Sequence, residues 1–176
     1  MTELTRPYAV DTTATRSRTH TWVLPENYAD AVDHSGLDLL RRSLDGDFPQ
    51  APICGTLGFR LVAADEGRAV FEGEPGEHLL NPMGSVHGGF LATLLDSALG
   101  SAVMTTLPAG RAYTTMQLGL NLVRPVFADT PLLRCEGTVI HAGRTTATAR
   151  VVGAADGRLY AHATTTCAVF AWRGAA

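Results

Sequence analysis

The longest apolar stretch of the chain carries a single acidic residue near its middle. Residues 86–107 consist mostly of leucine, alanine, valine and glycine, and Asp96 lies among them. A carboxylate in apolar surroundings costs several kcal/mol unless a partner compensates it. A chain that keeps an acid at this position is therefore expected to use it for chemistry.

The same stretch predicts a helix from about residue 87 to residue 106, ended by Pro108 and Gly110. A membrane span is the competing interpretation. It is disfavoured because an aspartate at the centre of a bilayer costs about 2.5–3.5 kcal/mol, and because Ser, Thr and Gly are scattered through the segment. A helix that is apolar on all sides in a soluble protein is buried on every side. This helix is therefore expected at the centre of the fold.

The remainder of the chain predicts strands. The clearest is 113–124, where apolar and polar residues alternate with a period of two, which is typical of a strand with one buried face. The apolar members of this alternation are Met116, Leu118, Leu120 and Leu122, and the polar members are Thr115, Gln117, Gly119 and Asn121. Further strands are expected at 59–64, 68–74, 132–141, 145–152 and 159–172, with turns at 65–67, 142–144 and 156–157.

The order of these elements, two strands, one helix and four strands, indicates an α+β protein. One long central helix wrapped by a curved antiparallel sheet is the hotdog fold, and residues 51–176 are expected to form this domain. Residues 1–50 are expected to be an N-terminal arm and helix. Within them, 1–34 shows weak periodicity, and a helix is predicted between a Ser35 cap and Gly46. Pro49 and Pro52 indicate a connector.

Composition excludes several classes of function. The chain has 176 residues, 45% hydrophobic and 18% charged, so disorder over most of its length is not expected. A net charge of -3 gives no electrostatic case for nucleic acid or for an anionic membrane. Three widely spaced cysteines form no C-x-x-C pair, which favours free thiols over a zinc site or a disulfide framework. With no apolar stretch near Met1, a cytoplasmic protein is expected.

A set of short motifs resembles the PaaI-type acyl-CoA thioesterases of the hotdog superfamily over roughly residues 51–171. The residues that carry the resemblance are Asn81, Gly84, His87-Gly88-Gly89, Asp96, Thr114-Thr115, Asn121 and Arg124-Pro125. The resemblance implies hydrolysis of an acyl-CoA thioester with no metal and no redox cofactor. It also implies a homodimer or a dimer of dimers, because each site in such enzymes is shared by two subunits.

The resemblance also implies roles for particular residues. Asp96 would be the nucleophile or the general base, and the Gly88 backbone N–H would be the oxyanion donor. Asn81 would help to hold the thioester carbonyl or the attacking water. Thr115 would orient the nucleophile or the water across the dimer interface.

The chemistry of these residue types agrees with such a reaction. The first N–H groups of a helix have no intrahelical partner and lie at the positive end of its dipole. Gly88 and Gly89 would let a substrate carbonyl approach that backbone closely. Eight residues of helix separate Gly88 from Asp96, or roughly 12 Å, which is too far for both to act on one carbonyl from the same helix. A site with Asp96 of one subunit facing Gly88 of another removes this difficulty. Small residues on the stripe 92, 96, 100 and 103 would let another backbone approach.

Several of these residues keep a second interpretation. His87 acts as acid or base, or shapes the turn into the helix, and the shaping role is favoured. Asn81 taken alone reads as a turn residue before Pro82. Thr115 and Gln117 read as an ordinary polar pair on one strand face, or as hydrogen-bond partners of Asp96.

The substrate is the least constrained part of the prediction. Gly89, Met83 and Phe90 are expected to contact it, with Gln117 as a weaker candidate. An apolar wall of Phe59, Met83, Phe90, Leu94 and Met116 is compatible with an aryl-acetyl or a medium acyl chain. Arg124 and Arg144, with Arg158, are candidates for the phosphates of coenzyme A. Two alternatives stay open, namely a non-catalytic acyl-CoA-binding module and a hotdog hydratase or dehydratase.

Overall fold

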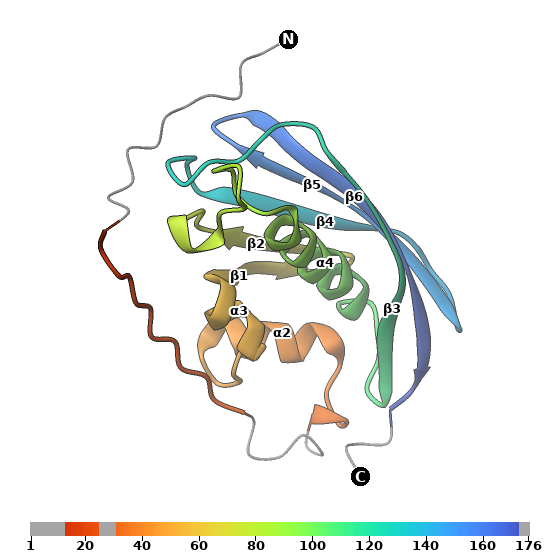
Figure 1. Cartoon of the computed structure of the whole chain (residues 1–176). Helices are drawn as coiled ribbons and strands as arrows, with labels where there is room; N and C mark the ends of the chain where they lie inside the picture. Colours follow the sequence, from red (N-terminus) through yellow and green to blue (C-terminus); the bar gives the residue numbers. More distant parts are fainter. Residues whose placement is uncertain (1–12, 25–30, 173–176) are drawn as a thin grey trace.

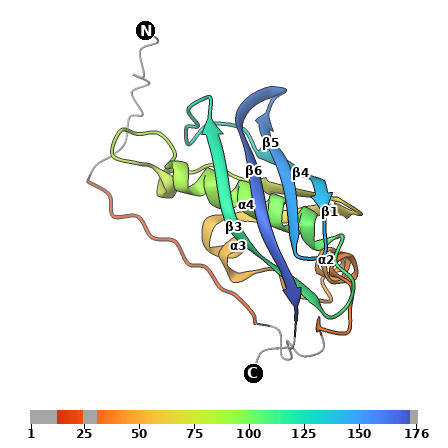
Figure 2. The same ribbon diagram turned by 90° about the vertical axis from the view of Figure 1, so that its right-hand side faces the viewer.

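A computed structural model describes residues 13–24 and 31–172 of the chain. At its centre lies the helix α4, Gly88–Met104, and a single six-stranded antiparallel sheet curves around it (Figure 1). The strand order is β1-β2-β4-β5-β6-β3, so β1 and β3 are the two edges of the sheet. Figure 2 shows the helix crossing behind the strands. This is the hotdog arrangement that the element order predicted.

All six predicted strands are present. Their bounds are β1 Phe59–Asp65, β2 Arg68–Gly73, β3 Arg111–Leu122, β4 Leu133–Ala142, β5 Thr146–Ala155 and β6 Arg158–Ala171. The largest shift is at the end of β5, which continues three residues beyond the predicted 152. A two-residue turn explains the extension, because Asp156 and Gly157 both have positive φ and Ala155 pairs directly with Arg158.

The sheet covers α4 with apolar side chains. Leu94, Leu95 and Leu99 are fully buried, and α4 packs against β2, β4 and β5. The closest approach is at Gly137 of β4, where an added Cβ would overlap the carbonyl group of Ala98. Glycine at that position lets strand and helix backbones touch.

The helix predicted from Ser35 to Gly46 is confirmed as α2, Gly36–Asp45. The Ser35 hydroxyl accepts a hydrogen bond from the Asp38 N–H at 3.2 Å, and Gly46 ends the helix with a φ of 86°. The predicted connector after it is in part wrong, because Pro52–Leu57 forms the short helix α3. Pro52 lies in its first turn, where a missing N–H costs nothing. A 3-10 turn, η1 Glu77–Leu79, was also not predicted.

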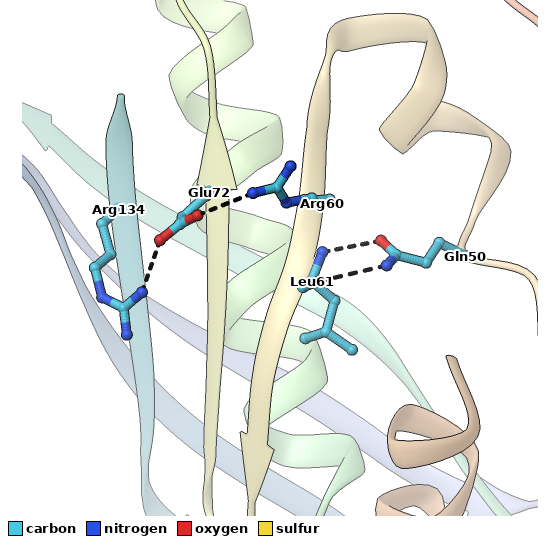
Figure 3. Close-up of polar contacts among 5 residues, drawn as sticks. All are labelled: Gln50, Arg60, Leu61, Glu72 and Arg134. Carbon is cyan, nitrogen blue, oxygen red and sulfur yellow. Dashed lines mark hydrogen bonds and ion pairs between the residues drawn. The ribbon is translucent and has the colours of Figure 1, made fainter. Parts of the chain in front are cut away.

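The helices α2 and α3 lie beside β1 and below α4 in the view of Figure 1. The N–H of Gly36 donates to the carbonyl of Leu107 at 2.9 Å, which fixes the start of α2 against the end of α4. At the other end of α2, the Gln50 side chain accepts from the Leu61 N–H at 2.9 Å and donates to the Leu61 carbonyl at 3.4 Å (Figure 3). The connector therefore adds its own hydrogen bonds to the edge strand β1.

Glu72 joins three strands on the sheet next to this contact. It forms ion pairs with Arg60 of β1 at 3.5 Å and with Arg134 of β4 at 2.8 Å (Figure 3). Exposed pairs of this kind contribute at most about 1 kcal/mol each. They align neighbouring strands rather than build a site.

The predicted N-terminal arm lies partly outside the described residues, which omit 1–12 and 25–30. Residues 13–24 form neither helix nor strand, and Arg16 of this segment pairs with Glu77 at 2.7 Å. No helix in the described parts of the chain is long and apolar enough to cross a membrane. The division of the chain at residue 50 stays a prediction.

Candidate active site

A β-bulge in β3 determines which of its side chains face α4. The pairing of β3 with β6 is regular up to Thr115 and Cys167, then shifts by one residue before Gln117. Because side chains alternate along a strand, an extra residue moves the later ones to the opposite face. Thr115 therefore lies on the inner face together with Leu118, whereas Met116 and Gln117 are exposed. The predicted strict alternation, with Thr115 and Gln117 on one face, is wrong for this reason.

Thr115 reaches Asp96 within the same protomer. Its hydroxyl donates a hydrogen bond to the Asp96 Oδ1 at 3.1 Å. Asp96 is half-buried on α4, beside the edge strand β3. The aspartate thus has the partner that its apolar surroundings require, and that partner is supplied by the bulged strand.

Tyr113 and Cys167 complete the surroundings of this pair. Burial raises the pKa of Tyr113 well above its ordinary value, and the nearby Cys167 and Asp96 raise it further. Burial also raises the pKa of the Cys167 thiol, and hydrogen bonding between this thiol and the Thr165 and Thr115 side chains partly offsets the increase. Both groups are therefore neutral at physiological pH, and Asp96 is the only acidic side chain of the cluster.

Tyr113 also closes part of the small-residue stripe of α4. An added Cβ at Gly100 would overlap the Tyr113 ring and hydroxyl, and Val103 is fully buried. The expectation that Gly100 and Val103 admit a backbone from another subunit is therefore wrong. The open part of α4 is its N-terminal half, around Gly89, Thr93 and Asp96.

The start of α4 has the predicted form. His87 is the N-cap, and its Nδ1 accepts the N–H of Gly89 at 2.9 Å. Among the residues that the structure describes, the N–H of Gly88 has no hydrogen-bond partner. Leu122 at the end of β3 lies against Gly88, with its Cδ1 2.8 Å from where a Cβ would be. The favoured shaping role of His87 agrees with this cap.

Asn81 organises the turn before this helix. Its Oδ1 accepts the N–H groups of Met83 at 2.9 Å and Ser85 at 3.3 Å, and its Nδ2 donates to the Ser85 hydroxyl at 2.9 Å. These contacts agree with the alternative interpretation of Asn81 as a turn residue. A role for Asn81 in holding a carbonyl or a water stays a prediction.

Asp96 also lines a cavity of about 300 Å³ that lies between α4 and the N-terminal helices. One wall comes from α4 and β3, and the opposite wall comes from α2, α3 and the connector between them. The lining residues are Leu39, Leu40, Ser43, Phe48, Pro49, Gln50, Ala51, Cys54, Leu61, Phe71, Asp96, Ser97, Ser101, Met104 and Tyr113.

None of the predicted apolar wall residues lines this cavity. Phe59, Phe90 and Leu94 are buried in the core against the sheet, whereas Met83 and Met116 are 83% and 59% exposed. The expectation that they form one wall beside Asp96 is wrong within a single protomer. The N-terminal helix α2, the connector after it and α3 supply that wall instead.

Of the three candidate phosphate-binding arginines, Arg124 and Arg144 lie far apart, and Arg158 begins β6. Arg144 is at the β4–β5 turn, and its carbonyl accepts a hydrogen bond from Arg111 at the start of β3. Arg124 follows the other end of β3, where its Nε donates to the Leu159 carbonyl at 3.4 Å. Eleven residues of strand separate these ends, or about 36 Å, so one protomer cannot bring both to the same phosphate. Arg124 lies two residues after Leu122, whose side chain contacts Gly88, so Arg124 is the candidate arginine at the start of α4.

Fold and site together define a hotdog protein with a hydrogen-bonded carboxylate on the open side of its central helix. Comparison with known proteins agrees. A profile of the thioesterase superfamily matches residues 83–170. The chain belongs to the thioesterase superfamily, and the predicted hotdog thioesterase class is confirmed at this level.

Solved structures of similar proteins include two with related names. A phenylacetic acid degradation-related protein from Ralstonia eutropha JMP134 is 33% identical, with 74% of this chain and 98% of that one covered and a TM-score of 0.68. The phenylacetic acid degradation protein PaaI from Thermus thermophilus, solved as an N33D mutant, is 30% identical, with 67% and 98% covered and a TM-score of 0.62. The predicted likeness to PaaI-type thioesterases is confirmed.

Two curated relatives match shorter segments. Acyl-coenzyme A thioesterase THEM4 of Bos taurus is 40% identical over 73 residues, which are 40% of this chain and 28% of the bovine protein. A protein named as an esterase from Halobacterium salinarum is 37% identical over 70 residues, or 39% of this chain and 44% of the halobacterial one. The matches span less than half the length of either relative.

Sequence reasoning missed the bulge and the cavity. Nothing in the residues 113–124 marks an extra residue, because Met116 and Gln117 fit a regular alternation. A signal for the cavity was present in Phe48, Pro49 and Gln50, where an apolar and proline-rich connector follows an amphipathic helix.

Proposed function

We propose that this protein is an acyl-CoA thioesterase with an active site shared between two subunits. Membership of the thioesterase superfamily supports the reaction class. The observation that carries the proposal for this chain is the Thr115–Asp96 hydrogen bond beside a cavity, because it leaves one oriented carboxylate facing space where a substrate can lie.

Asp96 acts as nucleophile or as general base. As a base it takes a proton from water, whose oxygen attacks the thioester carbonyl, and the C–S bond breaks to give a carboxylic acid and the thiol of coenzyme A. As a nucleophile its carboxylate attacks the thioester carbonyl, the C–S bond breaks and coenzyme A leaves as the thiolate, and water then hydrolyses the resulting anhydride to the carboxylic acid and free Asp96. Thr115 holds one carboxylate oxygen in either case, and catalysis by a positioned base contributes about 10²–10⁴-fold.

The Gly88 N–H stabilises the oxyanion that forms on the carbonyl. It has no partner among the described residues, and it lies at the positive end of the α4 dipole. One such donor is worth roughly 3–4 kcal/mol of barrier. Gly89 leaves room beside it for the substrate, and His87 holds the helix start in shape.

Two chains are needed to bring these groups together. Gly88 and Asp96 are eight residues apart on the unbroken helix α4, about 12 Å along its axis, so one copy cannot direct both at one carbonyl. A homodimer, or a dimer of dimers, that sets Asp96 of one copy opposite Gly88 of the other satisfies both distances. Arg124, near Gly88, is then the better phosphate partner for coenzyme A, and Gln117 and Met83 are exposed where the partner or substrate can reach them.

The two alternatives predict different chemistry. A hydratase would use His87 as acid or base, yet its Nδ1 accepts the Gly89 N–H and so serves the helix cap. A non-catalytic acyl-CoA-binding module would not need a carboxylate oriented by Thr115. Both alternatives are outcomes of the experiment below.

The test offers purified protein a panel of acyl-CoA esters and follows free thiol release with a colorimetric reagent. Hydrolysis that falls at least 100-fold in Asp96→Asn supports the proposal. The matched control is Asp65→Asn, which removes an exposed carboxylate paired only with Arg68, and it is expected to leave the rate unchanged. Equal rates in Asp96→Asn and the wild type contradict the catalytic assignment. Binding without cleavage, or water addition to an enoyl-CoA, favours one of the alternatives.

A further inference from the structure

The cavity beside Asp96 has a wall that the thioesterase superfamily match does not include. The matched region is 83–170, and eight of the lining residues precede residue 55. They come from α2, from the connector at 46–51 and from the start of α3. On the basis of the proposed function, we infer that this cavity holds the acyl group and that the N-terminal segment 36–57 sets the length of acyl chain that the protein accepts.

The position of Asp96 makes the cavity continuous with the reacting centre. Its carboxylate is one of the lining groups, next to Ser97 and Tyr113. A thioester carbonyl held near Asp96 therefore has its acyl chain directed between α4 and α2. The other direction, toward the exposed start of the helix, is left for coenzyme A.

The lining favours an unsubstituted hydrocarbon. Its apolar lining residues include Leu39, Leu40, Phe48, Phe71 and Met104. Two of the polar members are already hydrogen-bonded, since the Ser97 hydroxyl donates to the Thr93 carbonyl at 2.9 Å and the Gln50 side chain bonds to the Leu61 backbone.

The far wall of the cavity, which α2, the connector and α3 form opposite α4, also carries no charged side chain. Burial raises the pKa of Cys54 to about 11, so its thiol is neutral at physiological pH. Within the described residues, no fully buried side-chain nitrogen or oxygen lacks a hydrogen-bond partner. The far wall therefore carries no charged side chain, and its one hydroxyl group is that of Ser43.

The volume of the cavity limits the length of the acyl chain that it can hold. A cavity of about 300 Å³ holds roughly ten non-hydrogen atoms if each takes about 30 Å³, the share of one water molecule. An acyl chain of eight to ten carbons fits, and so does a phenylacetyl group. A chain of sixteen carbons does not.

The N-terminal wall is held at a fixed distance from α4. The Gly36–Leu107 hydrogen bond anchors α2 at one end, and the two bonds between Gln50 and Leu61 anchor the connector at the other. Because both ends are tied to the hotdog core, the wall limits the chain length instead of yielding to it.

Ser43 gives the sharpest test. It lines the cavity from the face of α2, so Ser43→Phe fills the space without removing a core side chain. Its neighbour Leu44 points elsewhere and is 37% exposed, so Leu44→Phe is the matched control on the same helix. Phe48→Ala tests the opposite direction, because it enlarges the cavity from the connector.

The measurement is kcat/KM for acetyl-, octanoyl-, phenylacetyl- and palmitoyl-CoA. The wild type is expected to prefer octanoyl- or phenylacetyl-CoA over palmitoyl-CoA by at least 10-fold. Ser43→Phe is expected to lower the octanoyl and phenylacetyl values at least 10-fold while acetyl-CoA stays within 3-fold, and Leu44→Phe to change none by more than 2-fold. Phe48→Ala is expected to raise palmitoyl relative to octanoyl at least 5-fold.

The outcomes separate this inference from the proposed function. If the wild type cleaves no ester, the proposed function fails. If it cleaves esters but Ser43→Phe has the same chain-length profile as Leu44→Phe, only the inference is overturned. Should Ser43→Phe fail to fold, an unchanged palmitoyl-to-octanoyl ratio in Phe48→Ala overturns it.

Discussion

The two sides of α4 differ in what they are made of and in what they do. The sheet side consists of fully buried leucines and alanines packed against β2, β4 and β5. The open side, in its N-terminal half, carries Gly89, Thr93, Asp96 and Ser97, which are exposed or half-buried. The face of α4 that packs in the core and the face that carries the candidate catalytic acid are therefore two different faces of one helix.

Hydrogen bonding follows the same division. The hydroxyls of Thr93 and Ser97 donate to helix carbonyls four residues earlier. Neither hydroxyl therefore needs a hydrogen-bond acceptor from another segment or from a ligand. Asp96 alone is held from outside the helix, by Thr115. A substitution on one side should therefore change activity without stability, and a substitution on the other should do the reverse.

The largest effect is expected from Asp96→Asn. Loss of the base or nucleophile should reduce kcat by about 10³-fold, or about 4 kcal/mol of barrier. The free energy of unfolding should change by less than about 1 kcal/mol, because asparagine still accepts the Thr115 hydrogen bond. Thiol-release kinetics and urea unfolding on the same preparation check both values. A large loss of stability would break the division between the two sides.

Leu95→Ala is the reciprocal test. Leu95 is fully buried and lies against Gly153 of β5. Its truncation should cost about 3 kcal/mol of unfolding free energy, within the range for leucine-to-alanine changes in cores. At a temperature where the variant stays folded, kcat should remain within about 3-fold of the wild type. Leu44→Ala, on a half-exposed residue, should cost less than about 1 kcal/mol by the same unfolding measurement.

Thr115→Val should have an intermediate effect on activity. Removal of the hydroxyl frees Asp96 Oδ1, and a drop in kcat of roughly 10-fold, or about 1.4 kcal/mol, is expected from the loss of one positioning hydrogen bond. Thr115→Ser should restore most of the rate. The adjacent Thr114 is exposed on the opposite face, so Thr114→Val should have the wild-type rate. Equal rates in the two valine variants would show that the hydrogen bond does not orient Asp96.

The smallest effect is expected on the face of the sheet turned away from α4, at the Arg68–Glu136 pair. Arg68 Nε and Nη2 each donate to one Glu136 oxygen at 3.0 Å. The hydrogen bond from Arg68 lowers the pKa of Glu136 from its ordinary 4.5, and burial partly opposes this. Both side chains are partly exposed, so Glu136→Gln should cost only about 0.5–1 kcal/mol at pH 7.

The sign of the pH dependence follows from the lowered pKa. The contribution of Glu136 is complete above its unfolded pKa near 4.5 and is lost as the pH falls through the lower folded value. The difference in unfolding free energy between wild type and Glu136→Gln should therefore be constant above about pH 5.5 and shrink below pH 4. A difference that grows in acid would contradict the pairing.

Much of the fold could be predicted because its signals are local. The apolar run around Asp96, the Ser35 and Gly46 caps, and the Asp156-Gly157 turn each mark an element within a few residues. That Asp96 would have a polar partner was also predictable, because a carboxylate in an apolar helix is costly without one, and the hydrogen bond from Thr115 supplies it.

What could not be predicted depends on contacts between distant segments. The bulge after Thr115 is defined only by its pairing with Cys167 on β6. The cavity needs α2, the connector and α4 in place together, and the short helix α3 has too few residues for a periodic signal. The pairing of two subunits that the family resemblance implies stays a prediction, since it depends on a second chain.

The most direct test of the shared site uses hybrid dimers of Asp96→Asn and Gly88→Pro chains. Proline removes the Gly88 N–H yet suits the first position of a helix after the extended His87, and Gly88→Ala, which keeps the N–H, is the control. Asp96→Asn alone and Gly88→Pro alone should be inactive, whereas Gly88→Ala should keep its activity. If sites are shared, the hybrid contains one site with an intact Asp96 and an intact Gly88, and it should recover about half of the wild-type rate per dimer. A hybrid as inactive as either parent would contradict the shared site.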